Sequence, residues 1–304
     1  MPVQFGGRVA IVTGAGGGLG REHALLLARS GAKVVVNDPG STLSGAAADR
    51  SVAQRVVDEI RAAGGEAIAN QDSVADAAGA ERIVRAAVQT YGRLDILVNN
   101  AGILRDKTFA KMNLEDFRLV VDVHLNGTVN CTKAAWSLMN EQRYGRVVVT
   151  TSVVGYGGGF GQANYGAAKM AVLGFMNCLA REGAKNNVLI NAISPSAVTR
   201  MTETLVAPEH ARHMRADLVS PAVAWLCSEE CVETALIVSA IAGYFSRVQM
   251  LESEGVQFDP RLPVTPEIVA EAFPRFVRME RAKPVDPNPV GDLNGRLRSL
   301  GLLT

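Results

Sequence analysis

Near its start, the chain passes from a strand-like run into a glycine-rich turn and then into a helical segment. The run is "RVAIVT" (8–13), the turn is "GAGGGLG" (14–20), and the helical segment is "REHALLLARS" (21–30). A strand that turns through glycines into a helix presents free backbone N–H groups and the positive end of the helix dipole at one point. This order predicts a site for the pyrophosphate of a dinucleotide, and the alternative is an ordinary glycine-rich turn.

Within this turn, the spacing Gly14-x3-Gly18-Leu19-Gly20 gives each glycine a separate physical task. Gly14 permits the tight turn, Gly18 lets the backbone approach the pyrophosphate, and Gly20 allows the helix to pack close to the strand. We therefore predict that Gly14, Gly18, Leu19 and Gly20 bind the cofactor.

A carboxylate ends the second strand-like run, "KVVVND" (33–38). In this position Asp38 can accept hydrogen bonds from the adenine-ribose hydroxyls of a dinucleotide. The same negative charge would repel a 2′-phosphate, and the next residues, Pro39 and Gly40, supply no arginine to neutralise one. The sequence therefore favours NAD over NADP, and the alternative is that Asp38 only begins a turn.

Strand-like and helical segments alternate through the first 200 residues, and a seventh strand-like run follows at 235–241. The expected strands are 8–13, 33–38, 66–70, 94–100, 146–152, 188–194 and 235–241. Two long helices are expected at 114–140 and 164–186. Alternation of this kind predicts an α/β fold of about seven parallel strands with helices on both faces. The strands are apolar throughout, as strands buried on both faces should be.

Composition narrows the possible partners. The chain has 31 basic and 30 acidic residues without a long run of either sign, so neither nucleic acid nor a membrane surface is an expected partner. No apolar run reaches the roughly 20 residues of a membrane span. Residues 1–20 lack the pattern of a signal peptide, and "LGLLT" is not a peroxisomal signal. We expect a cytoplasmic protein.

The composition changes after about residue 246, because seven of the twelve prolines lie between Pro260 and Pro289. We predict a catalytic domain at 1–245 and a C-terminal extension at 246–304, with a short helix starting at Thr265. The alternatives for this extension are that it covers the substrate cleft and that it covers a neighbouring subunit. The four cysteines are predicted to be buried thiols, with Cys227 and Cys231 on one helix.

The segment "ANYGAAKM" (163–170) places Tyr165 one helical turn before Lys169, with only small residues between them. A phenol is a poor base at neutral pH, but a nearby cation lowers its pKa. Removal of a hydride from an alcohol requires a base for the hydroxyl proton, and Tyr165 can serve if Lys169 and an oxidised nicotinamide stabilise its phenolate. Ser152, which follows the fifth strand, can hydrogen-bond the substrate oxygen. The alternative is an exposed helix face on which the Tyr/Lys pair has no role.

Together these motifs resemble the short-chain dehydrogenase/reductase family. The resemblance rests on the glycine turn, "NNAG" (99–102), Ser152, Tyr165-x3-Lys169 and "NAISP" (191–195), in this order. It implies a Rossmann fold. Segments such as "VNNAGILRDKTF" and "GFGQANYGAAKM" resemble one branch more closely, the (3R)-hydroxyacyl-CoA dehydrogenase domains of peroxisomal multifunctional enzymes.

The resemblance further implies cofactor contacts at the ends of several strands. Those near the adenosine are Asp72, Ser73, Asn99, Ala101 and Gly102. Those near the nicotinamide are Tyr165, Lys169, Pro195, Val198 and Thr199. It also implies a homodimer or homotetramer that pairs through the two long helices.

Where the family has a catalytic asparagine, this chain has His124, in "VHLNG" (123–127). Asn126 lies two positions later, which turns it about 200° around a helix, so it should not substitute. A histidine can hold the water that the asparagine would hold in a proton relay. We predict His124 as a catalytic residue, and the alternative is an interior histidine whose hydrogen bonds are all satisfied.

Two further stretches receive weaker assignments. His210 and His213 form an H-x-x-H without a carboxylate partner, which favours solvent-facing residues over a metal site, and no metal is expected. The stretch "GYGGGFG" (155–161) is predicted to be a loop whose backbone forms a pocket wall.

The function predicted from these residues is NAD-dependent interconversion of a secondary alcohol and a ketone. The resemblance implies 3-hydroxyacyl-CoA as the substrate, in fatty-acid or sterol side-chain β-oxidation. The alternatives are a 17β-hydroxysteroid dehydrogenase, an NADPH-dependent 3-oxoacyl reductase, and an NAD-binding regulator without activity. The last would predict the loss of Ser152, Tyr165 or Lys169, and all three are present.

Overall fold

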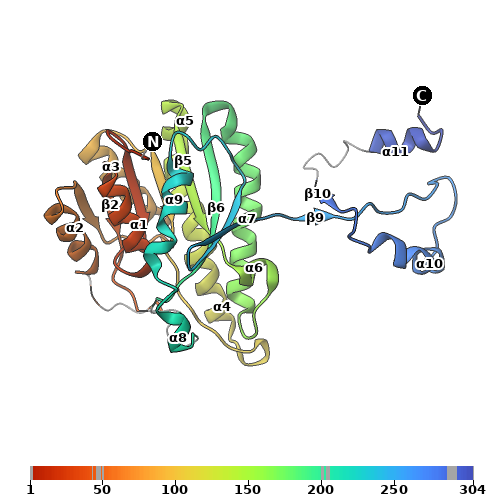
Figure 1. Cartoon of the computed structure of the whole chain (residues 1–304), viewed down its shortest axis with the longest axis horizontal. Helices are drawn as coiled ribbons and strands as arrows, with labels where there is room; N and C mark the ends of the chain where they lie inside the picture. Colours follow the sequence, from red (N-terminus) through yellow and green to blue (C-terminus); the bar gives the residue numbers. More distant parts are fainter. Residues whose placement is uncertain are drawn as a thin grey trace. The chain divides into compact units, whose positions relative to one another are not determined.

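One eight-stranded sheet, in the order β3-β2-β1-β4-β5-β6-β7-β8, organises the first part of the chain (Figure 1). Its strands are β1 (Val9–Thr13), β2 (Lys33–Asn37), β3 (Ala67–Asn70), β4 (Ile96–Asn99), β5 (Gly145–Thr150), β6 (Val188–Ser196), β7 (Ile237–Ile241) and β8 (Tyr244–Val248). Pairing is parallel from β3 through β7. Every residue of β1, β4 and β5 is buried, which explains why these strands are apolar without alternation.

The computed structural model describes residues 3–42, 44–45, 49, 51–199, 202, 206–285 and 293–303. It divides into two compact units, Met1–Arg247 and Val248–Thr304. The predicted α/β sheet with helices on both faces is confirmed, and the sheet has one strand more than the sequence analysis expected.

The additional strand, β8, lies at the edge of the sheet next to β7. Ala242 and Gly243 connect the two strands, and both have positive φ angles, 49° and 82°. Two central residues in the left-handed region are typical of a tight hairpin turn, so β8 runs back along β7. Sequence patterns contain little sign of this strand, because most of its residues are exposed and its turn lacks an Asn-Gly or Asp-Gly signal.

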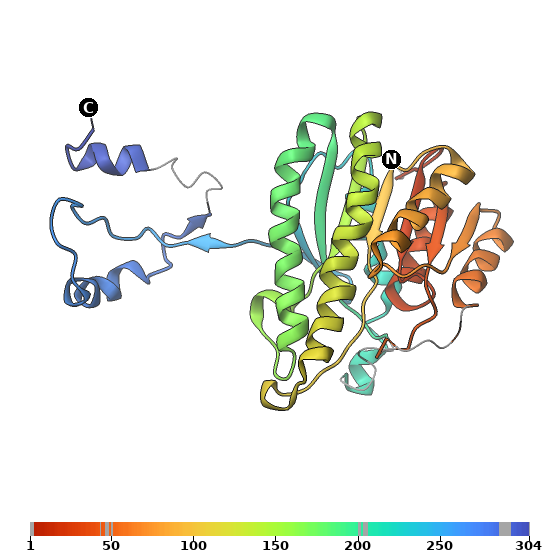
Figure 2. The ribbon, with the colours of Figure 1, turned by 180° about the vertical axis from the view of Figure 1, so that it is seen from behind.

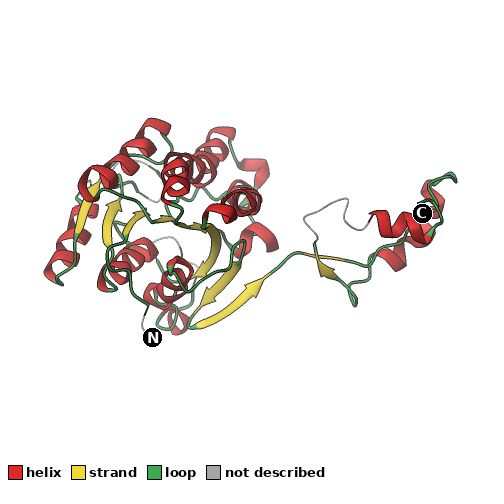
Figure 3. Cartoon of the chain, turned by 90° about the horizontal axis from the view of Figure 1, so that it is seen from above, coloured by secondary structure: helices red, strands yellow, loops and turns green. Residues whose placement is uncertain are grey.

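Helices cover both faces of the sheet, as Figures 2 and 3 show. One layer contains α1 (Gly18–Arg29), α2 (Val52–Ala62) and α9 (Ser220–Cys227). The other contains α3 (Ala77–Tyr91), α4 (Leu114–Val121), α5 (Gly127–Gln142) and α7 (Ala163–Gly183). Two shorter helices are α6 (Val153–Gly157) and α8 (Pro208–Ala211). None of the helices in the described ranges is long and apolar enough to cross a membrane.

The predicted long helix at 114–140 is interrupted. A π-helical turn, Asp122–Asn126, separates α4 from α5. Such turns insert one extra residue into a helix and occur often at functional sites. Here the turn carries His124, which is buried, whereas Asn126 is exposed and donates to Asp122.

The second unit contains β9 (Leu251–Glu252), α10 (Pro266–Phe276), β10 (Lys283–Pro284) and α11 (Leu293–Ser299). The predicted helix after Thr265 is confirmed, and the Thr265 side chain caps α10 by accepting a hydrogen bond from the Ile268 N–H. β9 and β10 pair antiparallel.

The cysteine prediction needs two corrections. Cys131, Cys227 and Cys231 are buried, but Cys178 is exposed on the outer face of α7. Cys227 and Cys231 do not share a helix, because α9 ends at Cys227. The Ser228 side chain instead accepts a hydrogen bond from the Cys231 N–H just after the helix.

A buried histidine joins the helices α1 and α9. The His23 Nδ1 lies 2.8 Å from the Ser220 Oγ, and the His23 Nε2 is buried without a partner among the described residues. Burial lowers the pKa of His23 from 6.5 to about 3, because the charged ring would lose its hydration inside the protein.

This burial predicts an acid-sensitive fold. Between pH 6.5 and 3 the unfolded chain binds a proton at His23 and the folded chain does not. The contribution of neutral His23 to the free energy of unfolding is therefore complete above pH 6.5 and is lost as the pH falls toward 3. In this window His23 should make the free energy of unfolding of the wild type fall by up to about 1.4 kcal/mol per pH unit, and we expect His23→Asn to remove this part of the fall. Urea unfolding between pH 7 and 4 measures it, with His213→Asn on the surface as control. Equal pH slopes in wild type and His23→Asn would contradict the prediction.

Candidate active site

The glycine turn has the backbone that its predicted role requires. Gly14 and Gly18 have φ angles of 63° and 53°, which side-chain-bearing residues rarely adopt. A Cβ on Gly20 would lie 2.3 Å from the Gly14 carbonyl oxygen, so only glycine permits this packing of α1 against the end of β1. The turn therefore forms a cradle of exposed backbone at a helix N-terminus, which fits a pyrophosphate.

Asp38, directly after β2, faces this turn. Its Oδ2 accepts a hydrogen bond from the Gly16 N–H at 2.9 Å, and its Oδ1 accepts one from the Gly40 N–H at 2.8 Å. These two bonds fix the carboxylate beside the glycine turn while each oxygen keeps further acceptor capacity. The geometry fits a carboxylate that accepts from ribose hydroxyls.

A cavity of about 470 Å³ connects the glycine turn with the predicted catalytic residues. Most of the residues predicted from the sequence line it. They are Gly14, Gly18, Leu19, Gly20, Asp38, Ser73, Ala101, Gly102, His124, Ser152, Tyr165, Lys169, Pro195 and Thr199. Its apolar part includes Ile103, Leu104, Leu119, Val123, Val153, Val206 and Met214. The carboxyl ends of the strands meet here, which is where α/β sheets of this kind bind ligands.

Three predicted cofactor contacts do not line this cavity. The Asp72 carboxylate is paired with the Arg82 guanidinium at 2.6 Å, and the Asn99 amide donates to the Thr132 hydroxyl at 3.1 Å. The Val198 N–H donates to the Met214 carbonyl. In this structure these groups hold loops and helices in place, and their contact with a cofactor stays a prediction.

Ser152, Tyr165 and Lys169 are brought together from two consecutive elements. Ser152 caps α6 by accepting from the Val154 N–H, and it also hydrogen-bonds the Tyr165 phenol. The Lys169 Nζ lies 5.6 Å from the centre of the Tyr165 ring and donates to the Thr150 carbonyl at 2.6 Å. The alternative of an exposed helix face is therefore wrong, because Lys169 is only 3% exposed.

The charges in this site are controlled mainly by burial. Burial raises the pKa of Tyr165, and the hydrogen bond from Ser152 opposes that rise. Burial also lowers the pKa of Lys169 to about 7. Burial thus opposes the phenolate in the protein without its cofactor, and the expectation that Lys169 and an oxidised nicotinamide together stabilise it stays a prediction.

His124 packs directly against Tyr165. The two rings meet edge to face with their centres 5.2 Å apart. The His124 Nε2 lies 2.8 Å from the Ile103 carbonyl oxygen and 3.1 Å from the Ile103 N–H, while its Nδ1 is buried without a partner among the described residues. Burial and the Lys169 charge lower the pKa of His124 well below 6.5, so the ring is neutral. The role of His124 in a proton relay stays a prediction.

Gly102 is required at its position because of His124. A Cβ on Gly102 would lie 2.4 Å from the His124 Cε1. Gly102, which the "NNAG" motif predicts as a cofactor contact, therefore also leaves space for the His124 ring.

The structure adds residues that the sequence analysis did not identify. Thr150 holds Lys169 through its backbone carbonyl, so no side-chain pattern could have identified it. Ser41, Thr42 and Gly45, from the loop after Asp38, also line the cavity. The sequence shows that the connection after Asp38 is long, but it does not show that this loop passes beside the cavity.

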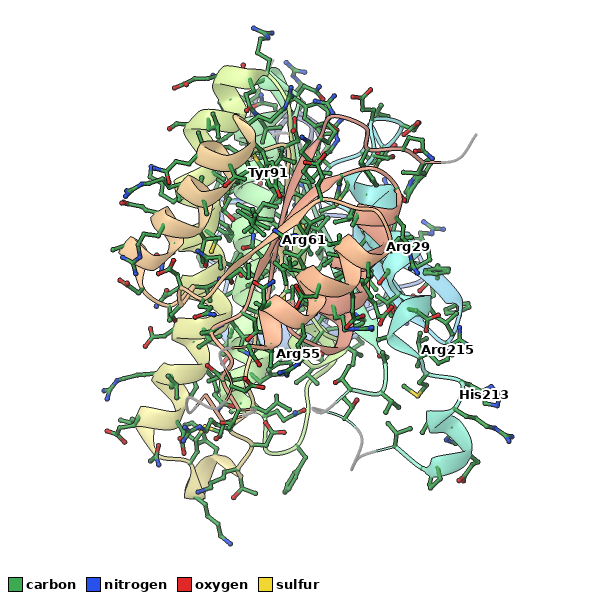
Figure 4. The ribbon with its side chains drawn as sticks, turned by 90° about the vertical axis from the view of Figure 1, so that its left-hand side faces the viewer. Arg29, Arg55, Arg61, Tyr91, His213 and Arg215 are labelled. Atoms are coloured by element: carbon green, nitrogen blue, oxygen red, sulfur yellow. The ribbon has the colours of Figure 1, made fainter. Side chains whose placement is uncertain are left out.

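The two weaker assignments have different outcomes. The stretch 155–161 is not all loop, because α6 includes Gly155–Gly157, and Tyr156 hydrogen-bonds Ser194 at 3.0 Å. The expected solvent exposure of His210 and His213 is confirmed, and Figure 4 shows His213 pointing outward.

Comparison with known proteins supports the assignment made from geometry. The family model for short chain dehydrogenases matches residues 8–210. The chain is 47% identical to the peroxisomal multifunctional enzyme type 2 of Drosophila melanogaster over 92% of its own length and 47% of that protein. It therefore spans about half the length of this relative.

Two solved structures show the same fold. The full-length Drosophila enzyme has a TM-score of 0.81 and 39% identity, with 98% of this chain and 50% of that chain covered. A 7α-hydroxysteroid dehydrogenase, solved with NADH and 7-oxo glycochenodeoxycholic acid, has a TM-score of 0.71 and 27% identity, with 79% and 94% covered.

The chain belongs to the short chain dehydrogenase family. As a member of this family, it is an oxidoreductase.

Proposed function

We propose that this protein is an NAD-dependent dehydrogenase that interconverts a 3-hydroxyacyl-CoA and a 3-oxoacyl-CoA. The observation that carries the proposal is the placement of Ser152, Tyr165 and Lys169 on the same cavity as Asp38 and the glycine turn. The nicotinamide ring, when bound, supplies the hydride acceptor. Ser152 holds the substrate oxygen, Tyr165 takes its proton, and Lys169 supports the phenolate.

NAD is favoured over NADP because Asp38 places a fixed negative charge beside the glycine turn. A 2′-phosphate at the ribose would meet that charge without a neutralising cation among the described residues that line the cavity there. The similarity to multifunctional enzymes and the apolar wall formed by Leu104, Leu119 and Val123 support an acyl-CoA substrate. A steroid alcohol is the second candidate, supported by the structural similarity to a hydroxysteroid dehydrogenase.

Steady-state reduction of NAD with three substrates tests the proposal: a (3R)-hydroxyacyl-CoA, its (3S) enantiomer and a 17β-hydroxysteroid. We expect the highest kcat/KM with the (3R)-hydroxyacyl-CoA. Turnover of the steroid alone would select the second candidate. Turnover of all three only with NADP would show that the cofactor assignment is wrong.

We further propose a homodimer or homotetramer that pairs through α5 and α7. The outer face of α7 exposes small and apolar side chains at helical spacing, Ala163, Ala167, Met170, Ala171, Gly174 and Cys178. A second copy of the chain would bury this face. A monomer in sedimentation equilibrium would contradict this proposal.

The proposed location is cytoplasmic, which cell fractionation tests.

A further inference from the structure

Arg105, on the segment between β4 and α4, contacts two elements with its guanidinium group. Its Nη1 lies 2.6 Å from the Asp116 Oδ1, and the Asp116 side chain is only 11% exposed. Its Nε donates to the Ser44 carbonyl at 2.7 Å. Arg105 therefore connects α4 to the loop that follows Asp38.

That loop forms part of the cofactor side of the cavity. Ser41, Thr42 and Gly45 line the cavity together with Asp38. Gly45 has a φ angle of 89°, and a Cβ there would lie 3.4 Å from Ile103 and 3.6 Å from Leu119. The hydrogen bond from Arg105 fixes the backbone at Ser44, the residue directly before Gly45.

The backbone of Arg105 has a separate role next to the catalytic tyrosine. Its carbonyl accepts a hydrogen bond from the Asn164 Nδ2 at 3.0 Å. Asn164 is fully buried, and its Oδ1 accepts from the Tyr165 N–H at 2.8 Å. This connection uses only the Arg105 carbonyl, so it survives a change of the Arg105 side chain.

We propose that Arg105 is a positioning residue for cofactor binding, an inference that rests on the proposed dehydrogenase function. Its guanidinium group holds Ser41, Thr42 and Gly45 in place beside Asp38, and the ion pair with Asp116 holds the guanidinium group in place. Arg105 acts through this loop, since it is not itself one of the described residues that line the cavity. Loss of the side chain should therefore weaken the cofactor complex and leave the chemical step almost unchanged.

The test compares Arg105→Met with the wild-type protein by titration calorimetry of NADH. A hydrogen bond from a charged donor contributes about 1.5–3 kcal/mol, so we expect the Kd of NADH to rise about 10- to 100-fold. In steady state, KM for NAD should rise similarly while kcat changes less than about threefold. Arg118→Met is the matched control, because Arg118 forms an exposed ion pair with Glu115 within α4.

A second variant separates positioning from stability. Arg105→Met leaves the Asp116 carboxylate buried without its cation, which destabilises the fold. Arg105→Met/Asp116→Asn removes that charge and should recover the melting temperature while NADH binding stays weak. Recovery of NADH affinity in the double variant, or an unchanged Kd in Arg105→Met, would overturn the assignment. If the wild-type protein itself bound no NADH, the proposed function would be wrong.

Discussion

Replacing Tyr165 with phenylalanine should lower kcat by about 10²- to 10⁴-fold, the usual contribution of a general base. The change removes one oxygen atom and keeps the ring, so the edge-to-face contact with His124 is preserved. Lys169 keeps its hydrogen bond to the Thr150 carbonyl, and α7 keeps its packing. The expected loss therefore belongs to the proton transfer and not to the fold.

Two measurements identify the cause of that loss. The Kd of NADH should stay within a few fold of wild type, because the glycine turn and Asp38 are untouched. Tyr91→Phe, which removes a phenol hydroxyl from α3 outside the cavity, should keep wild-type kcat (Figure 4). If Tyr165→Phe retained wild-type turnover, another group would have to be the base.

Replacing Asp38 with asparagine should reduce the preference for NAD over NADP by about 10- to 100-fold. The substitution removes the charge that repels a 2′-phosphate and weakens an acceptor for the ribose hydroxyls, together an effect of about 1.4–2.8 kcal/mol. The introduced side-chain amide has a single acceptor oxygen, so it would also lose one of the two bonds that the carboxylate accepts from the Gly16 and Gly40 N–H groups. The loss of that bond affects both cofactors, so the ratio of their kcat/KM values reports only the change at the 2′ position of the ribose.

The control for this change is Asp58→Asn on α2, whose carboxylate accepts from Gln54 on the surface. It should leave the cofactor ratio unchanged. An unchanged ratio in Asp38→Asn as well would show that the carboxylate does not select the cofactor, and the reductase alternative with NADPH would regain support.

The mechanism gains one constraint from the charges in the site. Burial raises the pKa of Tyr165 and lowers that of Lys169 to about 7. Neither shift favours a phenolate in the protein alone; a bound oxidised nicotinamide would supply a positive charge that favours it. Proton abstraction is therefore expected only in the complex with cofactor.

The sequence by itself predicted seven of the eight strands of the sheet, together with the glycine turn, Asp38, Ser152, Tyr165 and Lys169 of the site. Strand-helix alternation, the glycine spacing and the Tyr165-x3-Lys169 pair act over one or two neighbouring elements, so local patterns report them. The parallel sheet then brings Gly14, Asp38 and Ser152 to one edge, because each follows the carboxyl end of a strand, and Tyr165 reaches the same place from the start of α7.

Only the tertiary structure decided the contacts between segments distant in the chain. The π-helical turn that aims His124 at Tyr165, the space left for it by Gly102, and the connection of Ser44 to Asp116 through Arg105 depend on side-chain packing. No periodicity encodes them. The sign of the pKa shifts likewise depends on burial, which a residue acquires only when its neighbours in space exclude water.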